Sequence, residues 1–114
     1  MCAQTTLNTV LDRICEYARM VLGDKLYAVK LYGSYARGDY DEESDIDVMV
    51  VADISPNNRS EIRKKLFDFT YDLNLQYNVL LSVFIQDKDT FETYKDSYPF
   101  FKNIEKEGVD SGHL

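Results

Sequence analysis

The chain has 114 residues, of which 45% are apolar and 29% charged, as is typical of one globular domain spanning residues 1–114. Thirteen basic and 20 acidic residues give a net charge of −7, so we do not expect a protein that grips a nucleic-acid backbone. No apolar stretch reaches the roughly 20 residues of a membrane helix, and the N-terminal residues lack the pattern of a secretion signal. We therefore expect a cytoplasmic protein without a membrane partner.

The first third of the chain predicts a helix followed by a strand. Apolar residues recur at intervals of three and four over residues 7–22, and Gly23 ends the run. Residues 26–32, LYAVKLY, are rich in β-branched and aromatic side chains, which favours a strand. A Gly-Ser pair follows this strand directly.

The rest of the chain predicts two further strands and three helices. The strands are expected at 45–51 and 78–85, and a helix with one apolar stripe is expected between them at 55–76. Two short helices follow, one near 88–96 and one after Pro99. This order predicts an α/β (α+β) fold, with helices packed against a small mixed sheet of three or four strands.

Sulfur and imidazole ligands are scarce. The two cysteines, Cys2 and Cys15, are too few for a disulfide framework or a zinc site, and Cys15 falls on the apolar face of the first predicted helix. The single histidine, His113, has no neighbours with which to act. A bound cation would therefore depend on carboxylates.

Gly33 and Ser34 stand where a strand gives way to a turn. Glycine lets the backbone approach a ligand closely, and free N–H groups at such a turn can bind phosphate. The Ser34 hydroxyl adds another donor. A Gly-Ser pair is also common in ordinary turns, so the pair alone does not distinguish a phosphate site from such a turn.

Asp45 and Asp47 begin the second predicted strand. Side chains at positions i and i+2 of a strand share a face, with Cα atoms roughly 6.7 Å apart. Two such carboxylates repel each other, and a hard divalent cation such as magnesium relieves the repulsion. Residues 39–47 hold six of the 20 acidic residues and no basic one. The alternatives are a cation-attracting pocket or a merely solvated acidic loop.

Together these features resemble the Gly-Ser-x-Ala-Arg-Gly…Ser-Asp-x-Asp signature of the minimal nucleotidyltransferases, members of the polymerase-beta-like superfamily. The matching residues are Gly33, Ser34, Ala36, Arg37, Gly38, Ser44, Asp45 and Asp47. The resemblance covers essentially the whole chain and implies the fold of that superfamily.

The resemblance implies a magnesium-dependent transfer of a nucleotide from ATP. In the family, the Gly-Ser turn holds the terminal phosphates, and the two aspartates are the catalytic and metal-binding acids. Nucleotide contacts are then expected from Gly33, Ser34, Arg37 and Ser44. Arg37 either contacts phosphate or pairs with a nearby acid such as Asp39. An acceptor hydroxyl attacks the α-phosphate, and pyrophosphate leaves.

Many domains of this family are encoded beside a HEPN-domain protein and act as the antitoxin of a toxin–antitoxin pair. The resemblance therefore implies a HEPN-domain partner and transfer of AMP to one of its tyrosines. The acidic composition favours such a protein acceptor over a nucleic acid. The sequence leaves the oligomeric state open, whether homo-oligomer or hetero-oligomer.

The match breaks at a third acid, which active members carry on the next core strand. Here either Leu80 or Ser82 occupies that place, and neither can act as a general base at neutral pH. We expect neither Asp72 nor Asp87 to substitute. Two hypotheses remain: a protein adenylyltransferase, or a catalytically weakened module that neutralises its partner by docking. Transfer to a small molecule is a more remote third, since it would need additional substrate domains.

Overall fold

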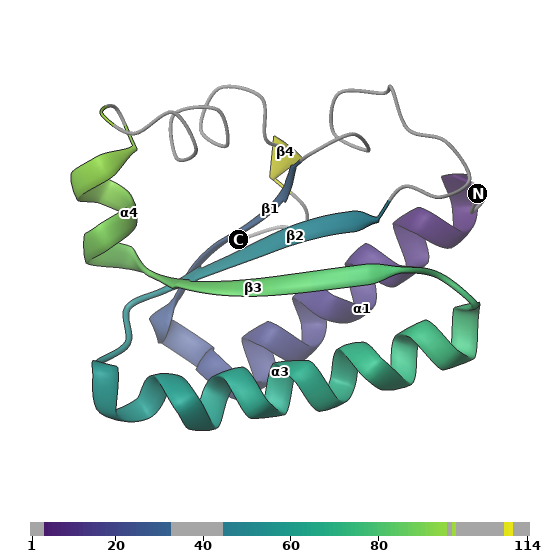
Figure 1. The fold of residues 1–114 in the computed structure, drawn as a ribbon, viewed down its shortest axis with the longest axis horizontal. Helices are drawn as coiled ribbons and strands as arrows, with labels where there is room; N and C mark the ends of the chain where they lie inside the picture. The colour runs from purple at the N-terminus through teal and green to yellow at the C-terminus, as the bar shows by residue number, and fades with distance from the viewer. Residues whose placement is uncertain (1–3, 33–44, 96, 98–108, 111–114) are drawn as a thin grey trace.

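The computed structural model describes residues 4–32, 45–95, 97 and 109–110, which form a mixed sheet with helices on both faces (Figure 1). The elements in chain order are α1 (Gln4–Leu22), the 3-10 turn η1 (Gly23–Lys25), β1 (Leu26–Tyr32), β2 (Ile46–Ala52), α3 (Pro56–Tyr77), β3 (Leu81–Asp87), α4 (Lys88–Tyr94) and β4 (Val109–Asp110). The strand order is β3-β2-β1-β4, with β1 antiparallel to both β2 and β4, and β2 parallel to β3. The predicted α/β fold with a small mixed sheet is confirmed.

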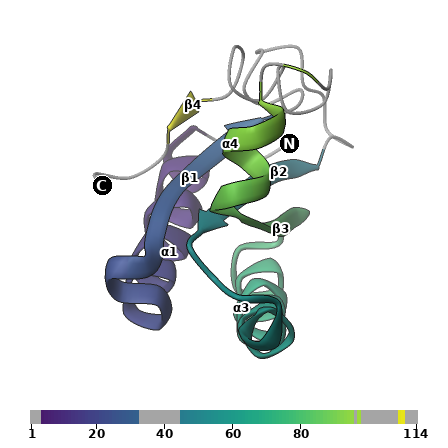
Figure 2. The ribbon, with the colours of Figure 1, turned by 90° about the vertical axis from the view of Figure 1, so that its left-hand side faces the viewer.

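The two faces of the sheet are covered unequally. Helices α1 and α3 lie side by side against one face, and the short helix α4 lies across the other (Figure 2). Tyr17 of α1 stacks on Phe69 of α3, with ring centroids 4.1 Å apart. The larger core lies under these two helices, whereas the smaller one joins Met49 and Val51 of β2 to Phe91 of α4. On the second face, the described core is therefore the small one under α4.

Local sequence explains where the first helix stops. The apolar positions of α1 face the core, including Val10, Ile14 and Ala18, each fully buried. Gly23 then adopts φ +56°, a left-handed conformation that costs glycine little and ends the helix. The buried thiol of Cys15 belongs to this core, as predicted.

The predicted third strand at 78–85 begins three residues too early and ends two residues too early. Asn78 adopts φ 52° and ψ 51° as the C-cap of α3, so it ends the helix and is not part of a strand. Val79 and Leu80 connect the cap to β3, which begins at Leu81 and runs on to Asp87. The strand start was misjudged because Asn78 directly precedes an apolar run, and such a run is typical of a buried strand.

The other boundaries differ less. The strand predicted at 45–51 begins at Ile46, and the helix predicted at 55–76 occupies Pro56–Tyr77. The helix predicted near 88–96 ends at Tyr94. The helix predicted after Pro99, like Cys2 and His113, lies outside the described residues.

Candidate active site

Asp47 lies on the central strand β2, within the sheet. The register pairs it with Tyr32 on β1 and with Ser82 on β3. Side chains alternate along a strand, and Met49, two residues after Asp47, packs against Phe91 of α4. Asp47 therefore faces the side of the sheet that carries α4, which we call the site face.

Asp45 influences Asp47 electrostatically. Asp45 is exposed and directly precedes β2, whereas Asp47 is half-buried within the strand. Burial raises the pKa of Asp47 above its ordinary value, and the negative charge of Asp45 raises it further. Ionising Asp47 is therefore costly, and a nearby divalent cation would offset this cost. The expectation that both acids belong to the strand was wrong for Asp45.

Two residues of β1 that the sequence did not single out share the site face. Tyr32 is half-buried, and its pKa is raised by burial and by the charge of Asp47. Lys30 is only 9% exposed, and its Nζ lies 6.0 Å from the centroid of the Phe91 ring. The alternation within LYAVKLY could have placed Lys30 and Tyr32 on a common face. Only the register shows that this face is the one occupied by Asp47.

The register also shows which of Leu80 and Ser82 is paired with Asp47. Ser82 is the β3 partner of Asp47, and it is exposed. Leu80 precedes β3, and its carbonyl accepts the N–H of Ile46 at 2.7 Å. Of the two residues that the sequence left open, Ser82 therefore faces Asp47 across the strand pair.

Neither alternative acid reaches this position, as predicted. Asp87 lies five residues beyond Ser82, roughly 16 Å along the strand. Its Oδ2 accepts the N–H of Thr90 at 2.8 Å and so caps α4. Burial would raise the pKa of Asp87, but the hydrogen bonds of Thr90 and the charge of Arg59 outweigh it and lower this pKa. Asp72 is exposed on α3, which covers the other face.

The remaining predicted site residues are not part of the described structure. Gly33, Ser34, Arg37 and Ser44 all lie outside the described residues. Among the residues that are described, no group of three or more His, Cys, Asp or Glu side chains could hold a metal ion. Both residues that the sequence predicts to hold a cation, Asp45 and Asp47, are among the described residues. Magnesium is commonly bound by one or two carboxylates together with substrate phosphates.

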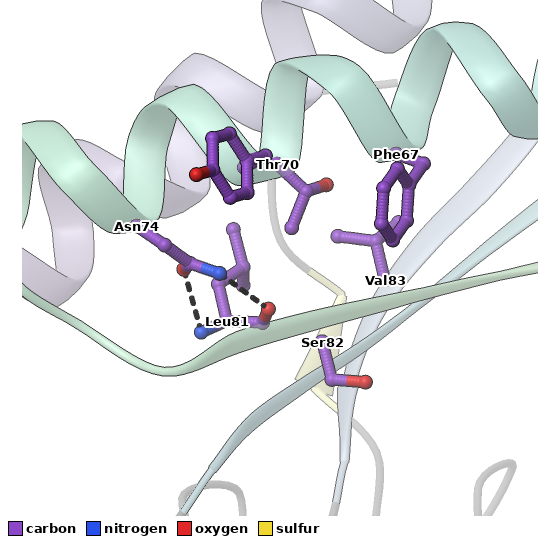
Figure 3. A pocket seen from close by; sticks show the side chains of 7 residues that line it. Phe67, Thr70, Asn74, Leu81, Ser82 and Val83 are labelled. Atoms are coloured by element: carbon purple, nitrogen blue, oxygen red, sulfur yellow. Dashed lines mark hydrogen bonds between the residues drawn. The ribbon is translucent and has the colours of Figure 1, made fainter.

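A groove of about 160 Å³ lies on the other side of β3, between this strand and α3 (Figure 3). The Asn74 side chain crosses its floor, because its Oδ1 accepts the N–H of Leu81 at 2.8 Å and its Nδ2 donates to the Leu81 carbonyl at 3.2 Å. The backbone of Ser82 borders the groove, but its side chain points away from it (Figure 3). The groove and the site face are therefore distinct surfaces separated by β3.

Comparisons with known proteins show the family to which the chain belongs. Residues 8–109 match the family described as nucleotidyltransferase domain. Three proteins of Methanocaldococcus jannaschii are similar in sequence, and the name of one is "Putative protein adenylyltransferase MJ0141". It is 40% identical over 90 residues, which cover 79% of this chain and 83% of the relative. MJ0604 and MJ1305 bear the same designation. MJ0604 is 34% identical over 74% of this chain and 76% of its own length. MJ1305 is 33% identical over 73% of this chain and 57% of its own length.

In the part of the chain that the structure describes, no helix is both long and apolar enough to cross a membrane. The family match begins within α1, ends within β4, and includes the Asp45–Asp47 pair. The chain therefore belongs to the nucleotidyltransferase domain family, as a minimal nucleotidyltransferase domain with the polymerase-beta-like fold.

Proposed function

We propose that this domain transfers AMP from ATP to a hydroxyl group of a partner protein. The observation that carries the proposal is the half-buried Asp47 on the central strand, whose pKa is raised by burial and by the neighbouring Asp45. The three similar proteins are each named "Putative protein adenylyltransferase", which supports a protein as acceptor. The net charge of −7 also favours a protein over a nucleic acid.

Asp45 and Asp47 would hold magnesium. Their oxygens are hard ligands of the kind this ion prefers, and neutralising the pair would offset the cost of ionising Asp47. When bound, magnesium supplies positive charge that stabilises the phosphates and the departing pyrophosphate.

The chain itself would position the two reactants. By resemblance, Gly33 and Ser34 hold the terminal phosphates, and Arg37 and Ser44 contact the nucleotide. The acceptor oxygen forms a bond to the α-phosphorus, the bond to pyrophosphate breaks, and the acceptor hydroxyl loses its proton. Ser82 cannot take this proton at neutral pH, so water or the released pyrophosphate accepts it.

The partner in this proposal is a HEPN-domain protein, and the pair forms a toxin–antitoxin system in the cytoplasm. A tyrosine hydroxyl of the toxin is the acceptor, as the family resemblance implies. Covalent attachment of AMP would then inactivate the toxin in a way that simple dissociation cannot reverse.

A second function is favoured by one observation. Ser82 occupies the position that faces Asp47, where active members carry an acid. Loss of a general base typically costs 10²–10⁴-fold in rate. A domain weakened to this extent would bind nucleotide and neutralise its partner by docking.

Calorimetry with ATP in the presence and absence of magnesium tests the proposed site. We expect the wild-type chain to bind ATP only with magnesium, and the double variant Asp45→Asn/Asp47→Asn to lose this binding. Asp12→Asn, exposed on α1 at the other face of the sheet, is the matched control and should bind as the wild type does. Undiminished binding by the double variant would refute the assignment of the metal site.

Mass spectrometry distinguishes the enzyme from the docking module. The domain is co-expressed with the HEPN-domain protein that we propose as its partner, and this partner is examined for an adenylyl group. We expect the modification with the wild-type domain and not with the double variant. A stable complex that carries no modification would exclude the transfer reaction and support the docking function.

A further inference from the structure

The accessible side chains of β3 on the site face are uncharged. Ser82, Phe84 and Gln86 alternate with the core residues of this strand, and the Ser82 side chain points away from the groove beside α3 (Figure 3). Phe84 is 41% exposed, whereas Gln86 is only 5% exposed and its Nε2 donates to Oδ1 of Asp87 at 3.0 Å. The accessible part, which we call the β3 strip, therefore consists of Ser82 and Phe84.

The β3 strip lies directly beside Asp47. Asp47 pairs with Ser82, and Met49, two residues further along β2, pairs with Phe84. Neighbouring strands are about 4.8 Å apart and two residues span about 6.6 Å, so the Cα atoms of Phe84 and Asp47 are roughly 8 Å apart, with both side chains on the same face. Met49 is itself fully buried. Phe84 is thus an exposed aromatic side chain next to the carboxylate.

The two strands that flank β2 differ in charge on this face. Strand β1 carries the basic Lys30 there, and it leads directly into Gly33 and Ser34, which by resemblance hold the phosphates. The site-face positions of β3, as far as the structure describes this strand, carry no charge. Anionic phosphates are therefore favoured over the β1 side, and this leaves the β3 side of Asp47 for the acceptor.

An aromatic acceptor fits the β3 strip better than an aliphatic one. Single exposed aromatic residues are common on protein surfaces, so the argument depends on the place of Phe84 beside Asp47. Two aromatic rings pack with their centroids about 4.5–7 Å apart, so a phenol ring resting on Phe84 can extend its hydroxyl toward Asp47. The hydroxyl of serine or threonine lies close to its own backbone, and such a residue offers Phe84 no ring.

We propose that Phe84 is the acceptor-binding residue of this domain, and that the ring of an acceptor tyrosine packs on it with the hydroxyl over Asp47 and Ser82. This inference rests on the proposed function and adds to it the strand over which the acceptor binds. The reaction itself is unchanged: the phenol oxygen bonds to the α-phosphorus, pyrophosphate leaves, and the proton passes to water or to pyrophosphate. The ring contact sets the affinity and the selectivity for the acceptor, and it does not touch the nucleotide.

NMR spectroscopy on the full chain tests the acceptor site without requiring transfer. The probes are N-acetyl-tyrosinamide and N-acetyl-serinamide, added with magnesium and α,β-methylene-ATP, whose methylene bridge prevents cleavage. We expect the tyrosine probe, and not the serine probe, to shift the amide resonances of Ser82 and Phe84. Phe84→Ala should weaken binding of the tyrosine probe about tenfold, because it removes the ring contact, and Phe84→Tyr should restore it.

Phe67→Ala is the matched control, because it removes a ring that is 68% exposed on α3, at the other face of the sheet. It should bind the tyrosine probe as the wild type does. Phe84→Leu keeps an apolar side chain without a ring and should also bind less tightly, and circular dichroism establishes that each variant is folded. Absence of shifts at Ser82 and Phe84, equal shifts with both probes, or equal binding by Phe84→Ala and the wild type would overturn the proposal. Weaker binding of α,β-methylene-ATP by Phe84→Ala would also overturn it, because the ring would then contact the nucleotide.

Steady-state kinetics separates this inference from the proposed function. With ATP and N-acetyl-tyrosinamide as substrates, Phe84→Ala should raise KM for the tyrosine probe about tenfold and leave kcat unchanged, as expected for a contact made equally in the ground state and the transition state. Binding at Phe84 without any adenylyl product would refute the transfer reaction and retain the acceptor site. Product formation that Phe84→Ala leaves unchanged would refute the acceptor site alone.

Discussion

Replacing Ser82 by aspartate would restore a carboxylate at the position that faces Asp47. The two residues are register partners on neighbouring strands, so their Cβ atoms are roughly 5 Å apart. At this separation two negative charges repel by about 1 kcal/mol in water and about 3 kcal/mol near a protein surface. Because Ser82 is exposed, screening favours the lower figure. Without magnesium, Ser82→Asp should therefore lower the free energy of unfolding by about 1 kcal/mol.

Magnesium should reverse this loss. A third carboxylate adds a hard ligand to the pair formed by Asp45 and Asp47, so the ion should bind the variant more tightly and stabilise it by mass action. Urea denaturation at pH 8, with and without magnesium, measures the effect. Ser82→Asn is the matched control, since it has nearly the same size but no charge.

Two results would refute this reasoning. If Ser82→Asp and Ser82→Asn had the same stability without magnesium, residue 82 could not lie next to Asp47. If magnesium stabilised neither variant, the carboxylates would not share a cation. Where both expectations hold, mass spectrometry of the co-expressed partner should also show faster adenylylation by Ser82→Asp, up to the 10²–10⁴-fold that a general base contributes.

Two further predictions concern stability. Asn74→Ala should lower the free energy of unfolding by about 1–2 kcal/mol, because two hydrogen bonds to Leu81 contribute about 1 kcal/mol each and the higher helix propensity of alanine returns up to about 0.7 kcal/mol. Urea denaturation measures the loss, and exposed Gln76→Ala should show none of it; equal stability of the two variants would contradict this account. Because the native pKa of Asp47 is raised above 3.8, the native state holds its proton more tightly than the unfolded chain does. The free energy of unfolding should therefore fall as pH rises from 3.8 through the raised native pKa, and then level off. Urea denaturation across this pH range measures the fall, and Asp47→Asn should remove it. A fall that persists in the variant would contradict its assignment to Asp47.

Periodicity carried most of the fold prediction. The apolar residues of α1 recur at three and four, and those of β1 and β2 gather in short runs, so both types of element were recognisable without tertiary information. The boundary at Asn78 was missed because asparagine is tolerated both at a left-handed helix end and at the start of a loop or strand. Only the backbone conformation distinguishes these cases.

The site was less predictable than the fold, because it depends on register. The spacing of Asp45 and Asp47 suggested a pair, yet the sequence could not show that Asp45 stands outside the strand. It also left Leu80 and Ser82 as equal candidates for one position. Pairing between β2 and β3 is set by the crossover through α3 and by burial of one face of each strand. These are long-range constraints that no local pattern contains.

The same register makes the proposed metal site and the proposed transfer reaction separable by mutation. Strand β2 is buried along nearly its whole length, so the position of Asp47 is determined by the core and not by the residue at position 82. Ser82 is exposed, and replacing an acid there removes a charge without leaving a cavity. A chain can thus lose the third acid while it keeps the fold and the Asp45–Asp47 pair. Under the proposed function, the difference between a domain that modifies a partner and one that only docks to it would therefore lie in the chemistry at one strand position and not in a change of architecture.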